Sequence, residues 1–434
     1  MEAVIVPEKK VLVAGEFDVV VCGGGPSGIV AAISAARAGC RTALIERLGF
    51  LGGSATAGLV VPISGFFHQG QQVTGGIAWE LVRRLEEVNG ARVEYPKGHV
   101  SIHTESYKLI AQRMAQENGV VLYTNSYLSD CGKSGGRVTH VIIQNKNGTE
   151  AIAGEAFIDA TGDGDLCCLA GVPMLKREEQ IQPLSLCFIL EGVDTSTELL
   201  RDCIHHDGRD GKPSCCSEIR TYLNRCVKEG KLKQFGGPWF NTLVQGKAIA
   251  VNVTRCAGDA VDCRLMRQAE FQLREDMFTV VELLRRQYPE FRDCSIVASG
   301  VNAGVRESRH IEGMELVTGQ MLMAGEKCIC PVARCAHPMD IHDAKSSEQT
   351  LRQLQHAAYV PFTALIPQTI SNLLAAGRCI CADRDAYASI RVQATLMSIG
   401  EAAGIMAALH CQTGDPVQDV YKRQYQESSM RRHP

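Results

Sequence analysis

The 434-residue sequence lacks a strong excess of charge of one sign, and it also lacks a long apolar run. Its formal net charge is −3, so it offers no basic field, and we expect no nucleic-acid partner. No apolar run approaches the ~20 residues of a membrane span, so we expect no membrane segment. The opening residues, MEAVIVPEKK, do not pair a cationic segment with an apolar one, so we expect no secretory signal and a cytoplasmic location.

Metal-ligand spacing is also missing, although the chain has 19 cysteines. A disulfide framework would need an oxidising compartment, which the missing signal argues against. A zinc or iron–sulfur site would favour C-x-x-C pairs. The closest groupings are instead Cys167-Cys168, Cys215-Cys216, Cys328-x-Cys330 with Cys335, and Cys379-x-Cys381. We therefore expect no metal, and we expect most cysteines to be reduced, buried apolar residues.

Residues 17–47 follow the order strand, glycine-rich turn, helix, strand and acid. The apolar run at 17–22 ends at Gly23, Gly25 and Gly28, whose spacing suits a tight turn, close approach to a pyrophosphate and close helix packing. A small-residue helix at 27–38 and a strand at 42–45 lead to Glu46, where a carboxylate can accept hydrogen bonds from a ribose. The unit predicts dinucleotide binding, and an accidental glycine turn is the alternative. The residues expected to contribute are Gly23, Gly25, Pro26, Ser27, Gly28, Glu46 and Arg47.

The loop that follows Glu46 is rich in small residues. Its sequence LGFLGGSATAGLV places Gly52, Gly53, Ser54 and Thr56 where they can pass under the phosphates toward a redox-active ring. A flexible connector is the alternative interpretation.

Periodic patterns predict the remaining elements. Amphipathic spacing indicates helices at 75–89 and 104–118, the second capped by Thr104, and a strand follows at 120–123. Residues 137–143 and 151–153 flank an Asn-Gly turn and predict a hairpin or meander. A separate buried strand at 157–160 then leads into the acidic turn 161–165. After residue 173 long helices appear, notably at 263–288, and the first pattern returns with a strand at 373–376 and a small-residue helix at 399–411.

With these motifs in place, the chain resembles the FAD-dependent oxidoreductase family of bacterial enzymes, within the glutathione-reductase-like and fumarate-reductase-like flavoproteins. The resemblance covers residues 17–414. It rests on GGGPSG with Glu46, LGG at 51–53, DATGDGDL at 159–166, GVRESR at 304–309, HPMDIH at 337–342, and NLLAAGRCI followed by SIRVQATLMSIGEAAG.

The resemblance implies how FAD would be held. The first glycine unit would hold the ADP half, with Glu46 on the ribose, and the ATGDGD turn would approach the ADP moiety or the pyrophosphate. A helix opening near 398–402 would point its positive end at the flavin. Asp383 and Asp385 add negative charge near this region, so they either face away from the ring or tune it. The further residues implied at the cofactor are Ala160, Gly162, Asp163, Gly377, Arg378, Ser389, Ile390 and Arg391.

The expected fold class is α/β. A Rossmann-like FAD-binding domain, with a discontinuous parallel sheet and a β-meander, would comprise residues 1–173 and 357–414. An inserted α+β substrate domain would comprise residues 174–356. Residues 415–434 are polar and are expected to form a disordered or non-native tail.

Arginine and histidine side chains gather in two late motifs of the inserted segment. A substrate clamp would use an arginine fork on a carboxylate or hydroxyl-rich ligand and a histidine that moves a proton. The alternative is salt bridging between domains, which the neighbouring Asp340 and Asp343 make credible. His68 is a further candidate, although a satisfied loop histidine is favoured there. The catalytic candidates are Arg306, Arg309, His337, His342 and Arg391.

No second G-x-G-x-x-G unit occurs in the sequence. An enzyme that reduces its flavin with NAD(P)H through a dedicated domain would usually carry one. We therefore predict an FAD-dependent oxidoreductase that exchanges a hydride between a small polar metabolite and flavin N5. The alternative is a flavin-binding electron-transfer subunit that works with a partner protein, such as an electron carrier.

Overall fold

The computed structural model describes residues 4, 8–95, 99–176, 181–204, 216–325 and 327–420. Two hydrophobic cores organise these residues. The larger core joins segments from both ends of the chain, and the smaller core lies within residues 184–303. The α/β fold class predicted from the sequence is confirmed, whereas the exact domain boundaries stay a prediction.

A parallel sheet forms the centre of the larger unit. Its strand order is β8-β2-β1-β11-β20, from Val121–Tyr123, Thr42–Ile45, Leu12–Cys22, Gly148–Asp159 and Leu373–Ala375. The first strand in sequence therefore lies in the middle of the parallel sheet, as in Rossmann-like folds. The strand order reverses at β1, because β2 and β8 lie on one side of it and β11 and β20 lie on the other. The carboxyl end of β1 therefore marks the crevice where such sheets bind ligands.

A β-meander extends this sheet, as expected. β9 (Tyr127–Ser134) and β10 (Arg137–Asn145) pair antiparallel, and β10 pairs antiparallel with the first half of β11. The prediction of separate strands at 151–153 and 157–160 was wrong. They are one strand, because β11 stays extended alongside β1 from Leu12↔Glu150 to Cys22↔Asp159.

Two helices and several short strands lie between β2 and β8 in the sequence. α2 (Gly76–Glu87) and α3 (Thr104–Glu117) confirm two predicted surface helices. The N-cap of α3 is His103 rather than Thr104, because Nδ1 of His103 accepts from the Ser106 amide at 3.3 Å. The short strands are β3 (Pro62–Ile63), β4 (Phe67–His68), β5 (Gln71–Gln72), β6 (Ala91–Glu94) and β7 (His99–Ile102).

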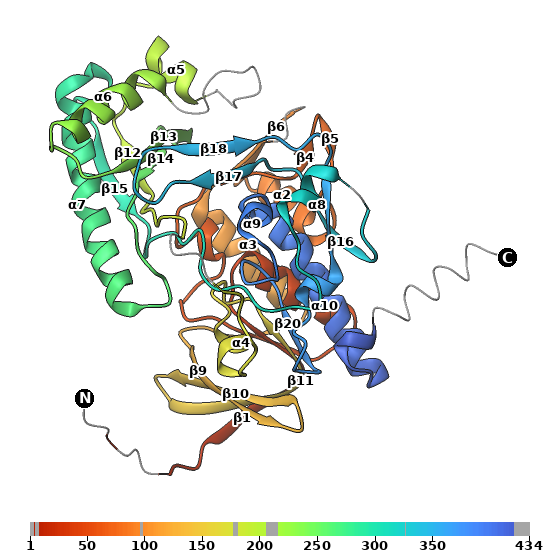
Figure 1. The fold of residues 1–434 in the computed structure, drawn as a ribbon. Helices are drawn as coiled ribbons and strands as arrows, with labels where there is room; N and C mark the ends of the chain where they lie inside the picture. The colour runs from red at the N-terminus through yellow and green to blue at the C-terminus, as the bar shows by residue number, and fades with distance from the viewer. Residues whose placement is uncertain are drawn as a thin grey trace.

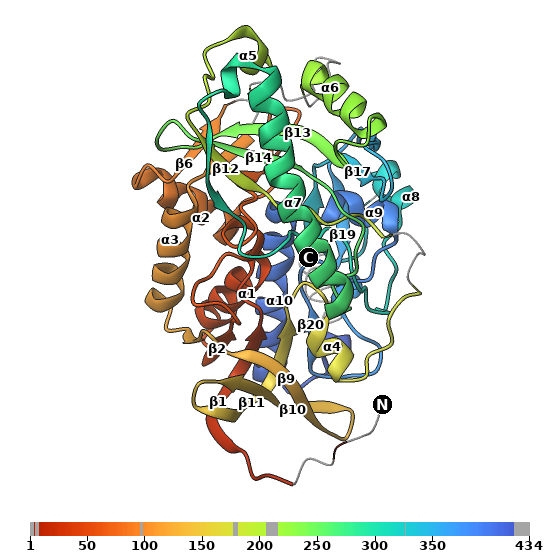
Figure 2. The same ribbon diagram turned by 90° about the vertical axis from the view of Figure 1, so that its left-hand side faces the viewer.

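The inserted segment has its own antiparallel sheet and helices. The sheet order is β13-β14-β12-β15, and helix α7 (Cys263–Gln287), predicted at 263–288, crosses its strands (Figure 2). Buried side chains of α7 and of the strands form the smaller core. The remaining bounds are β12 (Phe188–Glu191), α5 (Glu198–Ile204), α6 (Ser217–Lys228), β13 (Phe235–Thr242), β14 (Ile249–Thr254) and β15 (Ser295–Ser299).

A hairpin connects the inserted sheet with the larger unit. β17 (Met339–His342) and β18 (Gln349–Arg352) pair antiparallel, and their connecting turn accepts hydrogen bonds from Gln234 and Arg255 of the inserted segment. Both strands lie beside β13 and β14 in Figure 1. Other elements are α4 (Asp165–Leu169), α8 (Gly319–Ala324), β16 (Pro331–Cys335), β19 (Ala358–Pro361) and α9 (Arg384–Ile390).

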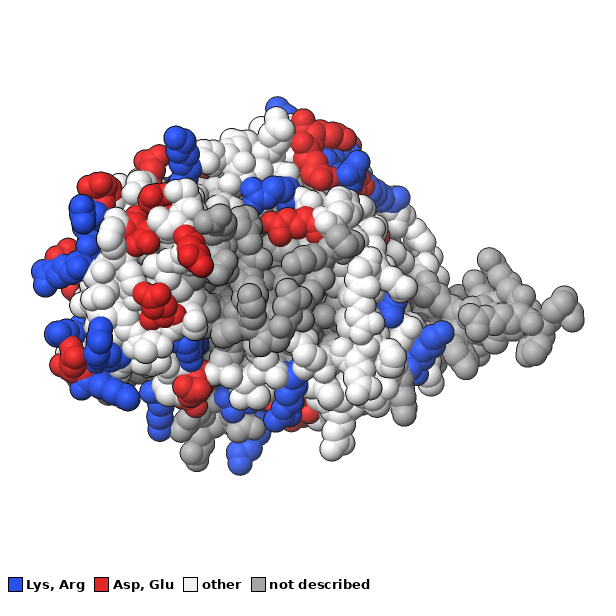
Figure 3. All heavy atoms as spheres, turned by 90° about the horizontal axis from the view of Figure 1, so that it is seen from above, with Lys and Arg blue, Asp and Glu red and all other residues white. Residues whose placement is uncertain are grey.

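Charges on the surface are mixed, and the described thiols are mostly free. Basic and acidic side chains are interspersed over the described part of the face in Figure 3.

Sixteen cysteines of the described residues are free, half of them buried, and Cys216 is disulfide-bonded. The described residues contain no group of three or more His, Cys, Asp or Glu side chains placed to hold a metal ion.

Helix α10 (Gln393–Thr413) begins six residues before its predicted start. Its length and composition would suit a membrane span, but 67% of its apolar window is buried inside the protein. The segment after it was expected to be a tail. Its first part instead packs, with Val417 and Val420 buried and the Val417 amide bonded to Ser371 at 2.9 Å, while residues 421–434 lie outside the described part.

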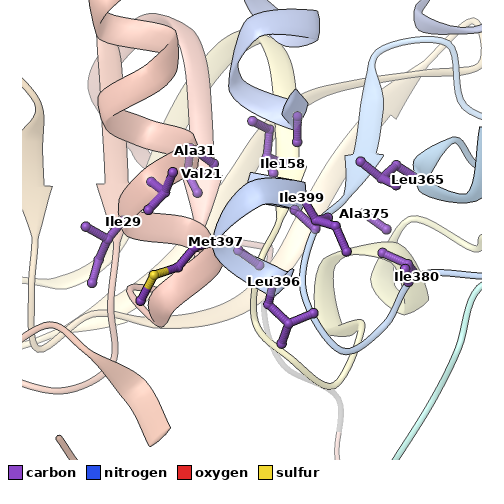
Figure 4. Packing of buried hydrophobic residues seen from close by; sticks show 14 of the residues in the cluster. Val21, Ile29, Ala31, Ile158, Leu365, Ala375, Ile380, Leu396, Met397 and Ile399 are labelled. Carbon is purple, nitrogen blue, oxygen red and sulfur yellow. The ribbon is translucent and has the colours of Figure 1, made fainter. Parts of the chain in front are cut away.

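Helices α1 (Pro26–Arg37) and α10 cross in close contact over the sheet. Figure 4 shows Ile29 and Ala31 of α1 and Met397 and Ile399 of α10 packed together with strand side chains. A Cβ at Gly400 would lie 2.1 Å from the Ser27 carbonyl oxygen, so glycine allows this approach. The start of α10 is thereby fixed beside the start of α1.

Candidate functional site

The glycine loop between β1 and α1 forms the first part of the site. Gly23 has φ +106°, and its amide donates to the Ile45 carbonyl at 2.8 Å. A Cβ at Gly28 would lie 1.8 Å from the Gly23 carbonyl oxygen, whereas a Cβ at Gly25 would meet no atom within 4 Å. Helix α1 begins at Pro26 without a side-chain cap, so the amides that follow Pro26 in its first turn are available to an anion.

Glu46 lies at the carboxyl end of β2 and is 7% exposed. Its carboxylate accepts from the Gly24 amide at 2.7 Å and from the Leu48 amide at 2.8 Å. Burial raises the pKa of Glu46, and these two hydrogen bonds partly offset the rise. The exposed Arg47 is an electrostatic neighbour of both Glu46 and Asp165. The carboxylate is thus fixed at the crevice, and its role on a ribose stays a prediction.

The small-residue loop after Glu46 lies against the glycine loop. The Gly52 amide donates to the Gly24 carbonyl at 2.8 Å, and a Cβ at Gly53 would lie 2.9 Å from the Gly25 Cα. Thr56 is buried and donates to the Leu51 carbonyl at 2.9 Å, while Ser54 is exposed. The structure therefore brings this predicted segment to the first glycine unit.

The acidic turn after β11 also meets the glycine loop. The Ala160 amide donates to the Cys22 carbonyl at 2.8 Å, and a Cβ at Gly23 would lie 2.3 Å from the Ala160 carbonyl oxygen. Asp159 is fully buried and accepts from the Thr161 hydroxyl at 2.7 Å and the Cys167 amide at 2.8 Å. These bonds hold the turn at the end of β11.

Asp163 is the hub of this turn. Its carboxylate accepts from Ser308 at 2.7 Å and from Arg378 at 2.9 Å, and its carbonyl accepts from Arg309 at 2.7 Å. Arg309 also pairs with Asp165. Arg309 thus ties the turn to the GVRESR segment, which agrees with the salt-bridge alternative for this residue. A Cβ at Gly162 would lie 2.7 Å from Nη2 of Arg378.

The residues of the late segments that were expected at the cofactor lie in two different parts of the structure. Gly377, with φ +111°, lies beside Ser27, since a Cβ at this position would be 3.7 Å from the Ser27 Cβ. Ser389 donates to the His337 carbonyl at 2.5 Å, Ile390 is buried, and Arg391 follows as the C-cap of α9. Ser389, Ile390 and Arg391 therefore join the HPMDIH segment rather than the glycine loop.

The geometry bears on two sequence expectations about this region. The expected helix opening near 398–402 was wrong, because these residues lie inside α10, which opens at Gln393. Asp383 caps α9 through the Ala386 amide at 2.8 Å and also accepts from Gly319 at 3.1 Å. Asp385 pairs with Arg352 at 2.8 Å. Both aspartates are therefore held by groups of the protein.

A charged group forms around Asp340 and His342 at the end of β17. Nε2 of His342 lies 2.9 Å from Oδ2 of Asp340, and its Nδ1 lies 2.8 Å from Nη2 of Arg255. Arg391 donates to the Asp340 carbonyl at 2.9 Å and lies 3.1 Å from its carboxylate. Gln349 donates to the other carboxylate oxygen at 2.5 Å. We call Arg255, Arg306, Asp340, His342 and Arg391 the Asp340 cluster.

Arg306 interacts electrostatically with Arg255, Asp340 and Arg391, and its side chain is held by hydrogen bonds to other residues. Its Nη1 donates to the Pro183 carbonyl and the Ser185 hydroxyl, each at 2.8 Å. Burial, followed by repulsion from Arg391 and Arg255, lowers the pKa of Arg306 to about 9. Burial and Arg220 lower the pKa of Arg255 to about 10. Both guanidinium groups remain protonated at neutral pH.

The two histidines of the HPMDIH motif differ in whether a ring nitrogen is left without a hydrogen bond to the described residues. Burial and Arg306 lower the pKa of His342 to about 3, so its ring is neutral, and both ring nitrogens are engaged. Burial lowers the pKa of His337, whose Nδ1 lies 2.8 Å from the Pro338 carbonyl and must donate to it. Nε2 of His337 is then the acceptor nitrogen. His68 lies apart, 3.3 Å from the Gln355 carbonyl.

Sequence reasoning missed Arg255, Trp239 and Gln182. Arg255 follows the buried strand β14, Trp239 stacks edge-on against His342 with ring centroids 5.6 Å apart, and Gln182 accepts from the His342 amide at 3.2 Å. An arginine directly after the apolar run 249–254 was the available signal. Its partner lies 87 residues further along the chain.

Comparisons with known proteins identify relatives over different lengths. The family model described as FAD dependent oxidoreductase matches residues 18–428. Digeranylgeranylglycerophospholipid reductase 2 of Methanopyrus kandleri is 30% identical over 195 residues, 44% of this chain and 48% of that protein. Soluble pyridine nucleotide transhydrogenase of Chromohalobacter salexigens is 27% identical over 157 residues, 34% of this chain and 30% of that protein. The chain thus spans about half or less of the length of these curated relatives.

A solved structure with similarity along the chain is a geranylgeranyl bacteriochlorophyll reductase-like protein from Thermoplasma acidophilum. It has a TM-score of 0.49 and 12% identity, and the match covers 96% of this chain and 84% of that one. A glycine oxidase from Geobacillus kaustophilus gives a TM-score of 0.45 and 11% identity, covering 94% and 95%.

Proposed function

Since this chain belongs to the FAD-dependent oxidoreductase family, with FAD as its cofactor, we propose that it exchanges a hydride directly between a small polar metabolite and the flavin. When bound, FAD supplies the hydride acceptor or donor at N5. We further propose that no dedicated NAD(P)H domain takes part, because the sequence carries a single G-x-G-x-x-G unit. Electrons would otherwise pass to a separate carrier protein.

The residues at the crevice fit the cofactor. The space beside Gly25 is open, and the buried Ser27 hydroxyl has no hydrogen-bond partner among the described residues. Nη1 of Arg378 is likewise buried without a partner in the described part of the chain. These groups, with the free amides of α1, would hold the phosphates, and Glu46 would hold the ribose.

The observation that carries the proposal is the link between the SIR segment and the HPMDIH segment. Ser389 donates to the His337 carbonyl, and Arg391 donates to the Asp340 carbonyl. The C-terminal end of helix α9 therefore holds the SIR segment and the HPMDIH segment together. In this arrangement Arg391 and Arg306 would orient the substrate. His337 would exchange a proton through Nε2, the ring nitrogen that its contact with Pro338 leaves as an acceptor. His342 would position Asp340 and Arg255.

An anaerobic titration tests the proposal. Purified holoprotein is mixed with fractionated metabolite pools, and the flavin absorbance band is followed with NADH alone as the comparison. Bleaching by a metabolite fraction but not by NADH supports direct exchange. Bleaching that requires an added carrier protein would favour the electron-transfer subunit. Bleaching by NADH alone would contradict the absence of an NAD(P)H-dependent route.

His337→Asn examines the proton role. We expect slower flavin bleaching with an unchanged FAD content, because the variant removes the ring but lies outside the glycine loop. His68→Asn is the matched control, since His68 lies on the short strand β4 and contacts a loop carbonyl. Equal rates in both variants would remove His337 from the reaction.

A further inference from the structure

We infer that the substrate carries a carboxylate, and that Arg255, Arg306 and Arg391 receive it where the inserted sheet meets β17. This inference rests on the proposed function, because it names the substrate class of the same site. The three arginines come from three separate segments: Arg255 follows β14, Arg306 lies in the GVRESR motif, and Arg391 caps α9. Packing of the inserted sheet against the larger unit brings them around Asp340 and His342.

Hydrogen-bond donors exceed acceptors in this place. Arg255 is 1% exposed, yet its Nε has no partner among the described residues. The same holds for Nε of Arg391 and for Nε2 of the fully buried Gln182. Buried donors without acceptors cost free energy, so a ligand that brings acceptor oxygens would be stabilised here. A neutral ligand that offers only donors would not.

The charges of the cluster also favour binding of an anion. The cations are the buried Arg255 and Arg306 and Arg391, whose side chain is 15% exposed. The carboxylates are Asp340, whose side chain is 13% exposed, and the buried Glu307, which accepts from the Gln182 backbone amide at 2.9 Å. Three positive charges against two negative charges leave one positive charge uncompensated.

The remaining neighbours do not change this balance inside the cluster. Both histidines are neutral because burial lowers their pKa values. Arg220, Asp343 and Glu348 also act electrostatically on Arg255. The Arg220 side chain is 20% exposed and adds a further positive charge, whereas the Glu348 side chain is 79% exposed. Water screens such peripheral charges much more than buried ones.

Guanidinium chemistry favours a carboxylate over a general anion. Arginine presents a planar fork that matches the two oxygens of a carboxylate or two oxygens of a phosphate. A single uncompensated charge suits a monocarboxylate better than a phosphate dianion. Trp239, packed against His342, gives this place an apolar wall that would take the carbon part of an organic acid.

Binding of small acids to the holoprotein tests the inference. The probes are acetate, glycolate and lactate, each paired with its amide, and inorganic phosphate. The readouts are the flavin absorbance change and the fluorescence of Trp239, one of two tryptophans in the chain. We expect the acids to bind and the amides to bind at least roughly tenfold more weakly, because an amide carries no charge.

Conservative variants locate the binding. Arg306→Lys and Arg391→Lys keep the charge but remove the fork, so we expect roughly 10- to 100-fold weaker acid binding with unchanged FAD content. Arg352→Lys is the matched control, since Arg352 pairs with Asp385 on the surface and should bind acids like the wild type. Equal binding of acids and amides, binding of phosphate alone, or saturation by none of the acids would overturn the inference.

The outcomes separate this inference from the proposed function. Acids that bind at the arginines without any metabolite bleaching the flavin would leave the carboxylate site standing and remove direct hydride exchange. Bleaching by a neutral metabolite, with no acid bound, would keep the exchange and remove the carboxylate site.

Discussion

Nη2 of Arg255 lies 2.8 Å from Nδ1 of His342 and, because arginine has no acceptor, it fixes Nδ1 as the acceptor of that hydrogen bond. The proton of the neutral ring is then on Nε2, which donates to Asp340 at 2.9 Å. His342 is therefore a bridge between a buried cation and a buried anion. A ring with both nitrogens engaged positions its neighbours, and a second histidine must carry any proton transfer.

This bridge predicts a pH-dependent stability. The pKa of His342 falls from 6.5 to about 3 on folding, so between these values the unfolded chain binds a proton that the folded chain does not. Stability from this group is therefore complete above pH 6.5 and decreases as the pH falls toward 3. Between pH 7 and pH 5 the wild type should lose about 2 kcal/mol through His342, measured by urea unfolding.

His342→Asn provides the comparison, because its side-chain oxygen can still accept from Arg255 but cannot titrate. The variant should be less stable at pH 7 and lose less stability on acidification. Asp340 does not interfere in this window: burial alone would raise its pKa, but His342 and Arg391 hold it below its usual range. The same pH slope in both proteins would mean that the ring is not buried in its neutral form.

The nucleotide-binding half of the fold could be predicted because its signals are local. Strand, glycines, helix and second strand follow one another in the expected order. The helix and the second strand begin and end within one residue of the expected places, whereas β1 begins at Leu12, five residues before its predicted start. The continuity of β11 could not be predicted, because Gly148 and Gly154 interrupt its pattern while the neighbouring β1 determines its path.

The Asp340 cluster could be predicted only in part. His342 and Arg391 stood out by their motifs, but Arg255 reaches His342 through packing of the inserted sheet on the β17–β18 hairpin. The periodicity of a sequence does not encode such a contact. For the same reason, the sequence could not predict the ion pair of Arg309 with Asp165, because the fold brings the GVRESR and DATGDGDL motifs together.

The hub at Asp163 predicts a graded loss of stability. Asp163→Asn removes the charge that pairs with Arg378, and both side chains are 19% exposed, so we expect a loss of about 2–3 kcal/mol in the free energy of unfolding. Ser308→Ala removes a single hydrogen bond to the same carboxylate and should cost about 1 kcal/mol. Equal losses in the two variants, measured by chemical denaturation, would show that the carboxylate charge contributes no more than a single hydrogen bond.

The buried thiols predict a selective labelling pattern. Burial, followed by the nearby Asp159, raises the pKa values of Cys22, Cys167 and Cys379 well above the usual range. Alkylation needs an accessible thiolate, so iodoacetamide should modify the exposed Cys168 and Cys263 first. Peptide mass spectrometry of the folded holoprotein measures the order. Early labelling of Cys167 would show that the turn after β11 opens readily.

Two glycines of one loop should respond differently to the same substitution. Gly28→Ala places a Cβ 1.8 Å from the Gly23 carbonyl oxygen, so it should destabilise the protein by about 1–3 kcal/mol or more, with or without FAD. Gly25→Ala places its Cβ in open space at φ −74°, which alanine tolerates, so the apoprotein should keep its thermal midpoint.

The same Gly25→Ala variant should nevertheless bind FAD roughly tenfold or more weakly, because the added methyl group occupies the space left for the pyrophosphate. FAD content after gel filtration and the thermal midpoint of the apoprotein together measure the two effects. A Gly25→Ala protein that is stable and retains FAD like the wild type would mean that the open space beside Gly25 is not where the phosphates bind. Because that result leaves the fold intact, it would exclude the cofactor position without questioning the sheet that presents it.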